Sequence, residues 1–208
     1  MKKLILVSGK MRSGKNTFAD MIGDILSPIM EVKYDLFAKD LKFGVRDDFA
    51  KLHQFIKSEY QKIPLELKEY FHWMDVKEEN FFEDKTEYSR LLLQIYGTEI
   101  FRNRVDDNWW VKQVENRYLK FSHESGDGVY IVTDVRFPNE IKYFHQYDTV
   151  SVRVERENKE GTYNEEHISE KALDDFGNFD CRISNNGSLG ELRKEAEKFC
   201  SSLILGVN

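Results

Sequence analysis

Residues 9–17 read GKMRSGKNT and decide the fold of this chain. They follow the apolar run LILV at residues 4–7 and precede apolar residues that recur at helical spacing. Glycines at both ends allow successive backbone N–H groups to point inward, and the N-terminus of the next helix adds the positive end of its dipole. The stretch therefore predicts a phosphate-binding loop between a buried strand and a helix.

The loop also predicts which residues contact a nucleotide. Lys15 can reach the β- and γ-phosphates, and the hydroxyl available to Mg²⁺ comes at Thr17, because Asn16 stands directly after the lysine. This GKxT spacing resembles the phosphate loops of nucleoside monophosphate kinases. A phosphate loop alone leaves hydrolase, kinase and regulatory module open. The candidate nucleotide-binding residues are Gly9, Lys10, Arg12, Ser13, Gly14, Lys15, Asn16 and Thr17, with Thr17 also the candidate metal ligand.

Four further strand-like stretches are separated by helical patterns, which predicts an α/β fold with a five-stranded parallel sheet. Residues 1–208 are expected to form a single domain, in which residues 58–88 are a peripheral helical cover because residues 66–88 are rich in acids and aromatics. The capping box of Ser188 and Glu191 predicts the last helix. The expected strands are residues 4–7, 32–37, 129–132, 149–154 and 179–183, and the other expected helices include residues 38–57, 86–104 and 108–121.

A second anion-binding stretch follows the central strand. Asp134 and Arg136 lie where that strand ends, in a sequence that resembles the DGFPR stretch of adenylate kinases. Because ligands bind at the carboxyl ends of parallel strands, Asp134 can order a magnesium-bound water or an acceptor hydroxyl, and Arg136 can hold a phosphate bidentately. The alternative is a surface turn, with Pro138 at the first position of the next helix.

At three other places in the chain the sequence allows two interpretations. Gly97 interrupts a helical pattern, which indicates either close approach of a ligand or a notch for packing. Trp109 and Trp110 predict either one indole in the core and the other over a base, or core packing alone. Asn185 and Gly187, which come after the last strand, either line a base pocket or turn the chain.

Composition narrows the classes of function. The 208 residues contain 31 Lys+Arg and 37 Asp+Glu, a formal net charge of −6 at pH 7. This net negative charge argues against binding to a nucleic-acid backbone but does not exclude binding of a small anionic ligand. No apolar stretch reaches the roughly 18 residues of a membrane span, and Cys181 and Cys200 lack metal-ligand spacing. We therefore expect a soluble, cytoplasmic protein with small-molecule nucleotide partners, no nucleic acid and no membrane.

Taken together, the motifs resemble the deoxynucleoside monophosphate kinases of tailed bacteriophages. The resemblance implies a P-loop monophosphate kinase fold that uses ATP and Mg²⁺ to convert deoxynucleoside monophosphates to diphosphates, in a family whose members tend to be homodimers. The motifs are, in order, GKMRSGKNT (9–17), FAKDLK (37–42), RLLLQIYGTE (90–99), DDNWWV (106–111), VTDVRFPNE (132–140), HISE (167–170) and NNGSLGEL (185–192).

By matching position, the resemblance implies roles along most of the chain. Lys15, Asp134 and Arg136 would act in catalysis, and residues 156–168 would form a small lid from which Arg156 contacts a phosphate. The family often has aspartate at the positions of Asn16 and Asn186, and residues 66–88 have no counterpart, which leaves base specificity open. The monophosphate site would comprise Ala38, Lys42, Arg90, Gly97, Thr98, Trp110, Asp134, Arg136 and Glu140.

Two alternative functions stay open. One is a P-loop kinase that acts on another small phosphorylated metabolite, and the other is a nucleotide-binding module without turnover. Lys42, Arg90 and Arg136 favour a kinase, because a module that only senses a nucleotide needs no second cationic cluster.

Overall fold

The computed structural model describes residues 2–46, 87–124, 126–157 and 168–206. The chain divides into two compact units, one formed by Met1–Phe37 with Val111–Asn208 and the other by Ala38–Trp110. Most of the expected cover, residues 58–86, and most of the expected lid, residues 158–167, lie outside the described residues.

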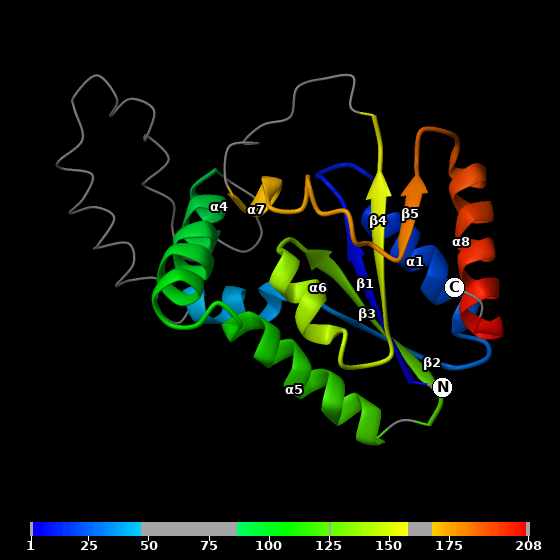
Figure 1. Ribbon diagram of the computed structural model, residues 1–208, viewed down its shortest axis with the longest axis horizontal. Coiled ribbons are helices and arrows are strands. Elements are labelled where there is room, and N and C mark those ends of the chain that lie inside the picture. The colour runs from blue at the N-terminus through cyan, green and yellow to red at the C-terminus, as the bar shows by residue number, and fades with distance from the viewer. Residues whose placement is uncertain (1, 47–86, 125, 158–167, 207–208) are drawn as a thin grey trace. The chain divides into compact units, whose positions relative to one another are not determined.

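The first unit is built on a five-stranded parallel sheet, as the sequence predicted (Figure 1). The strand order is β2-β3-β1-β4-β5, which places β1 at the centre. A central parallel strand is covered on both faces, and residues 3–8 are accordingly all buried. The strands are β1 (Lys2–Ser8), β2 (Glu31–Asp35), β3 (Gly128–Val135), β4 (Thr149–Glu155) and β5 (Cys181–Ser184).

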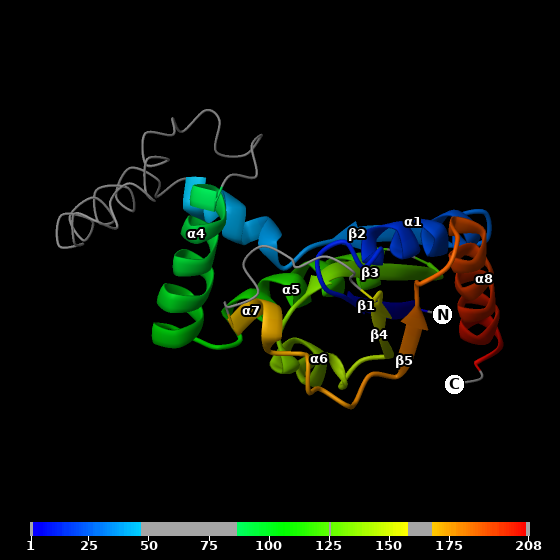
Figure 2. The same ribbon diagram turned by 90° about the horizontal axis from the view of Figure 1, so that it is seen from above.

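Helices cover both faces of this sheet (Figure 2). α1 (Lys15–Leu26) and α8 (Leu189–Leu205) pack on one face, where the Phe18 and Phe199 ring centroids lie 5.9 Å apart. On the other face, α5 (Trp109–Glu124) places Tyr118 and Phe121 against Tyr130 of β3, with centroids 5.6 and 5.3 Å apart. The alternation of side chains along a strand explains the division, since neighbouring residues point to opposite faces.

Two further helices of the first unit are short, and α8 begins at the capping box that the sequence predicted. α6 (Pro138–Phe144) begins at Pro138, and α7 (Ile168–Lys171), which no sequence pattern predicted, has only four residues. The predicted capping box of α8 is confirmed, because the backbone N–H of Ser188 donates to the Glu191 carboxylate at 2.7 Å. Among the described helices, none combines the length and apolar character that a membrane crossing requires.

In the second unit the described residues are helical apart from the turn at residues 105–108. Residues 38–46 form a helix, and the helix expected over residues 86–104 is observed as α4 (Glu87–Gln94) followed by the π-helix η3 (Ile95–Arg102). Gly97 lies in η3, and a Cβ atom there would come within 3.0 Å of Leu41 Cδ2. Of the two interpretations of Gly97, the packing notch therefore has a contact that supports it.

Candidate active site

The phosphate loop connects β1 to α1, in the strand–loop–helix context that the sequence predicted (Figure 1). Arg12 and Gly14 both have positive φ, 62° and 90°, and the Ser13 N–H donates to the Lys10 carbonyl at 3.1 Å. A Cβ atom on Gly14 would lie 2.2 Å from Asn185 Nδ2, so both the backbone angle and the packing require glycine. No acidic residue occurs in the first turn of α1, which leaves the positive end of its dipole uncompensated there.

Two side chains in the loop have the chemistry that a phosphate requires. Lys15 is the first residue of α1, and its ammonium donates to the Lys10 carbonyl at 3.4 Å, which places the charge over the loop. Ser13 is only 2% exposed, and its hydroxyl has no hydrogen-bond partner within the described part of the chain. A buried hydroxyl without a partner costs free energy, and a phosphate oxygen bound in the loop is the kind of acceptor that would remove this cost.

Asn185 supports the loop from the end of β5, a role that the sequence did not predict. Its side-chain amide donates to the Ser13 carbonyl at 2.8 Å, and its backbone N–H donates to the Glu155 carbonyl at 2.7 Å. Asn186, next in the chain, accepts from the Glu157 N–H at 2.8 Å. Asn185 therefore fixes the phosphate loop, and the predicted place of this stretch at a base pocket stays a prediction.

Asp134, Arg136 and Glu140 lie together where β3 gives way to α6. The Asp134 carboxylate accepts from the backbone N–H of Phe37, the second residue after β2, at 2.8 Å. Glu140 is 2% exposed, and its carboxylate accepts from the backbone N–H groups of Arg136 and Phe137 at 2.7 and 3.1 Å. Glu140 thus holds the backbone of Arg136, whose side chain is exposed.

A buried carboxylate that the sequence did not single out lies at the end of β2. Asp35 is 5% exposed, and one of its oxygens accepts from Arg117 Nε at 2.7 Å and from the Tyr130 hydroxyl at 2.5 Å. Burial, together with this hydrogen bond, raises the pKa of Tyr130 well above its usual range. Arg117 also donates to the Leu36 carbonyl at 3.1 Å, so the cluster fixes the segment that leaves the sheet.

The candidate residues of the second unit divide into exposed and buried ones. Lys42 is exposed and Arg90 is half-buried, as a residue that meets a ligand can be. Thr98 and Trp110 are 7% and 5% exposed, and the Trp110 indole N–H donates to the Gly97 carbonyl at 2.9 Å. Trp110 also packs on Phe101, with centroids 5.1 Å apart, which is the core position that one interpretation gave it.

Arg156 and Gly187 follow the neighbouring parallel strands β4 and β5 at their carboxyl ends. Arg156 is exposed directly after β4. Gly187 leaves room for the capping carboxylate of Glu191, because a Cβ atom there would lie 2.3 Å from Glu191 Oε2. Their predicted contacts with a nucleotide, like those of Ala38, remain predictions.

The donors available for a metal fit Mg²⁺ bound mainly through a nucleotide. Thr17, in the first turn of α1, supplies the hydroxyl, and the described residues contain no group of three or more His, Cys, Asp or Glu side chains that could hold an ion. Mg²⁺ characteristically takes few protein ligands and completes its shell with phosphate oxygens and water. The loop therefore suits the metal–nucleotide complex better than the free ion.

Comparison with known proteins identifies the family. The model of the family described as deoxynucleotide monophosphate kinase matches residues 33–196. The chain belongs to this family. Because the matched range begins after the phosphate loop, the loop and the family match are separate observations that agree.

Relatives of this family and one solved structure are consistent with that assignment. The deoxynucleotide monophosphate kinase of Enterobacteria phage T4 is 28% identical in an alignment 237 positions long. The alignment covers 91% of this chain and 95% of that protein. The one of Escherichia phage RB69 is 33% identical over 109 residues, covering 52% of this chain but only 43% of the relative. The dephospho-CoA kinase from Campylobacter jejuni aligns over 99% of both chains with a TM-score of 0.53 at 15% identity, which supports the P-loop kinase fold alone. The expected class, a phage-type kinase that phosphorylates nucleotides, is confirmed.

Proposed function

We propose that this protein transfers the γ-phosphoryl group of ATP to deoxynucleoside 5′-monophosphates, forming the diphosphates and ADP. The observation that carries the choice of donor is the phosphate loop, in which Lys15 lies over the loop carbonyls and the Ser13 hydroxyl is buried without a partner among the described residues. The family match supports the choice of acceptor.

In this proposal the chemistry needs no general base. The second pKa of a phosphate monoester is about 6, so a nucleotide 5′-phosphate is largely dianionic at pH 7 and can attack the γ-phosphorus directly. The work of the protein is to bring two highly negative groups into line and to neutralise the charge on the transferring group.

The residues of the first unit supply most of that charge. Lys15 and the loop N–H groups hold the β- and γ-phosphates, and Arg136, whose backbone Glu140 fixes, contacts the transferring phosphoryl group. Thr17 would hold Mg²⁺ together with phosphate oxygens, and the ion when bound supplies further neutralisation. In the first unit, our candidates for contact with the monophosphate are Asp134, Arg136 and Glu140. In the second unit, taken by itself, the candidates are Ala38, Lys42, Arg90, Gly97, Thr98 and Trp110.

A coupled assay of ADP formation tests the proposal. Each of the four deoxynucleoside monophosphates is supplied with ATP and Mg²⁺ to the wild type and to Lys15→Ala, Arg136→Ala and Lys194→Ala. We expect acceptor-dependent turnover that falls by about a thousandfold in Lys15→Ala and in Arg136→Ala, a loss typical of removing a group that stabilises transition-state charge. Lys194, exposed on α8, is the matched control and should retain wild-type turnover.

Two other results would replace the proposal. Stabilisation by ATP without ADP formation for any acceptor would indicate a nucleotide-binding module. Turnover only with a phosphorylated metabolite outside the nucleotide panel would indicate a different small-molecule kinase.

A further inference from the structure

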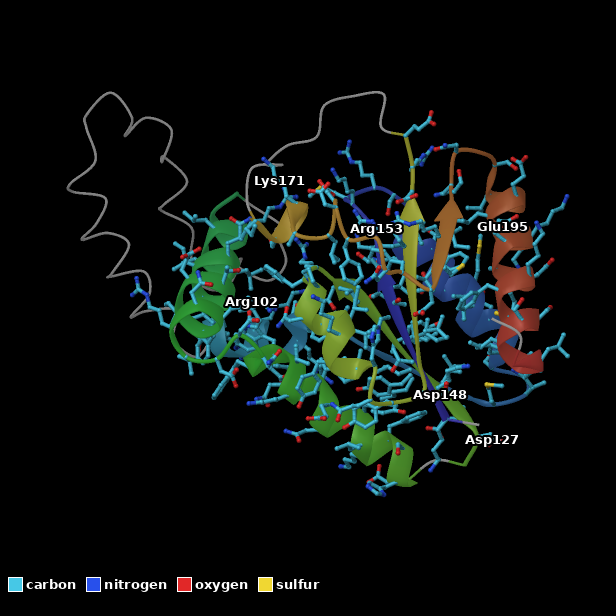
Figure 3. The ribbon with its side chains drawn as sticks, viewed as in Figure 1. Arg102, Asp127, Asp148, Arg153, Lys171 and Glu195 are labelled. Atoms are coloured by element: carbon cyan, nitrogen blue, oxygen red, sulfur yellow. The ribbon has the colours of Figure 1, made fainter. Side chains whose placement is uncertain are left out.

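A buried arginine lies directly behind the phosphate loop. Arg153 of β4, labelled in Figure 3, is opposite Ser8 of β1 in the parallel register, so the two residues are neighbours at the carboxyl ends of their strands. Arg153 Nη1 donates to Ser8 Oγ at 2.9 Å, and Ser8 Oγ donates in turn to the Val135 carbonyl at 3.0 Å. Ser8, the last residue before the loop, is therefore held by β4 and β3 together.

The other half of the guanidinium reaches the loop by a second route. Arg153 Nη2 donates to Asp174 Oδ1 at 3.3 Å, and Asp174 Oδ2 lies 3.0 Å from the Lys10 ammonium. Ser8 and Lys10 flank Gly9 in the chain, so Arg153 and Asp174 join the two neighbours of the first loop glycine to each other. We call this connection, Ser8–Arg153–Asp174–Lys10, the loop tether.

The residue at the end of the tether also takes part in the hydrogen bonds of the loop. The Lys10 carbonyl accepts from both the Ser13 N–H and the Lys15 ammonium, at 3.1 and 3.4 Å. Gly9 packs closely on β4, because a Cβ atom there would lie 2.7 Å from the Val154 carbonyl oxygen. Lys10 is therefore hydrogen-bonded both to the loop turn and to the ammonium that we assign to the phosphates.

A contribution to the stability of the fold accounts for the Arg153–Asp174 pair but not for the Asp174–Lys10 pair. Arg153 is 8% exposed, and a buried guanidinium requires a counter-charge, which Asp174 supplies. The link from Asp174 to Lys10 joins side chains that are 33% and 42% exposed, and such exposed pairs contribute little to stability. This link joins the side chain of the second loop residue to Asp174, and through Asp174 to Arg153.

We propose that Arg153 and Asp174 are positioning residues for the nucleotide, which hold the phosphate loop in its binding conformation before ATP arrives. This inference rests on the proposed function, since it concerns the same loop. Holding a loop in its bound conformation improves affinity because the cost of ordering it is not incurred on binding.

The test compares two adjacent aspartates. Asp174→Asn keeps the shape of the side chain and removes one charged acceptor, and Asp175→Asn makes the same change at the next, exposed residue. We expect Asp174→Asn to weaken ATP binding about three- to tenfold by calorimetry in the presence of Mg²⁺, the size of effect that ordering one or two side chains produces. Asp175→Asn should stay within about twofold of the wild type, and the KM for the monophosphate should be unchanged in both.

A double-substitution cycle separates positioning from general stability. If Asp174 acts through Lys10, Asp174→Asn should add no further loss of ATP affinity to Lys10→Met. Arg153→Lys, which retains the charge but not both hydrogen bonds, should weaken ATP binding less than Arg153→Met.

Three outcomes overturn the inference: equal ATP affinity in Asp174→Asn and Asp175→Asn, a full additional loss in the Lys10→Met background, or a parallel rise in the KM for the monophosphate. Failure of the proposed function is distinguishable from these, because the wild type itself would then bind no ATP or show no acceptor-dependent turnover.

Discussion

At the residue scale, the phosphate loop depends on side chains that come from distant parts of the sequence. Asn185 follows the last strand, yet its amide fills the space against which Gly14 packs and satisfies the Ser13 carbonyl. Glu140 acts similarly at the second anion-binding stretch, where it holds a backbone rather than a ligand. Asn185 and Glu140, which fix the backbone of residues that we assign to phosphate, are both buried.

Asn185→Ala tests this dependence. The change leaves the Ser13 carbonyl without its donor at a buried position, which costs about 1–3 kcal/mol of unfolding free energy. We also expect weaker ATP binding, measured by calorimetry beside urea unfolding, because the loop loses one of its fixed points. Asn186→Ala, at the next and exposed position, is the control, and an equal effect of the two changes would contradict the prediction.

At the scale of single elements, a capping box stabilises the first turn of α8. Ser188 and Glu191 exchange hydrogen bonds between side chains and backbone, and the helix ends at Gly206 with a φ of 65°. Its apolar stripe, which includes Phe199 and Cys200, packs on α1 and the sheet. Correct placement of α8 therefore supports the helix on which the phosphate loop ends.

Removing this cap should lower the free energy of unfolding without changing the candidate active site. Ser188→Ala removes the acceptor for the Glu191 N–H, and we expect a loss of about 0.5–2 kcal/mol in unfolding free energy. Turnover at saturating substrate should be unchanged at temperatures well below the melting point. Ser201→Ala on the exposed face of the same helix should cost less than Ser188→Ala, and thermal unfolding compares the two.

The elements that the sequence predicts well are those whose signal is local. The run at residues 4–7, the capping box at Ser188 and the start of α6 at Pro138 each depend on neighbouring residues, and each is observed. α7 was missed because four residues are too few to show a period, and η3 because its eight residues are too few to separate the repeat of a π-helix from that of an α-helix.

The contacts that fix the candidate site could not be predicted from neighbouring residues in the sequence. Asn185 meets Ser13, and Arg153 meets Ser8, only because the strand order places β4 beside β1 and β5 beside β4. Hydrophobic periodicity predicts that strands exist, but it does not specify which strands are neighbours. The phosphate-contacting candidates thus came from motifs, and their supports came from topology.

At the scale of the whole molecule, folding raises the pKa of two groups that titrate at high pH, the Cys200 thiol and the Tyr147 hydroxyl. Burial raises the pKa of the Cys200 thiol to about 11, and a hydrogen bond to Glu115 together with burial raises that of Tyr147 to about 12. In the unfolded chain the same groups lose their protons near their ordinary values, 9.0 and 10.0. Between those values and the folded ones, the unfolded state binds fewer protons than the folded state.

The free energy of unfolding should therefore fall as the pH rises above about 9. Urea unfolding at pH 8, 9, 10 and 11 measures this slope for the wild type and for Cys200→Ala. The variant is expected to be less stable at every pH but to lose part of the slope between pH 9 and 10. An identical slope in the two proteins would show that the thiol does not retain its proton.

The strand order also has a consequence for synthesis on the ribosome. β1 is made first and is the most buried strand, but its two partners, β3 and β4, begin only at Gly128 and Thr149. At typical translation rates of about 5–20 residues per second, the apolar segment at residues 4–7 waits for several seconds without either neighbour. During that interval it is an unpaired β-strand exposed to other nascent chains, so the yield of folded protein should depend on the speed of translation and on chaperones that cover this segment.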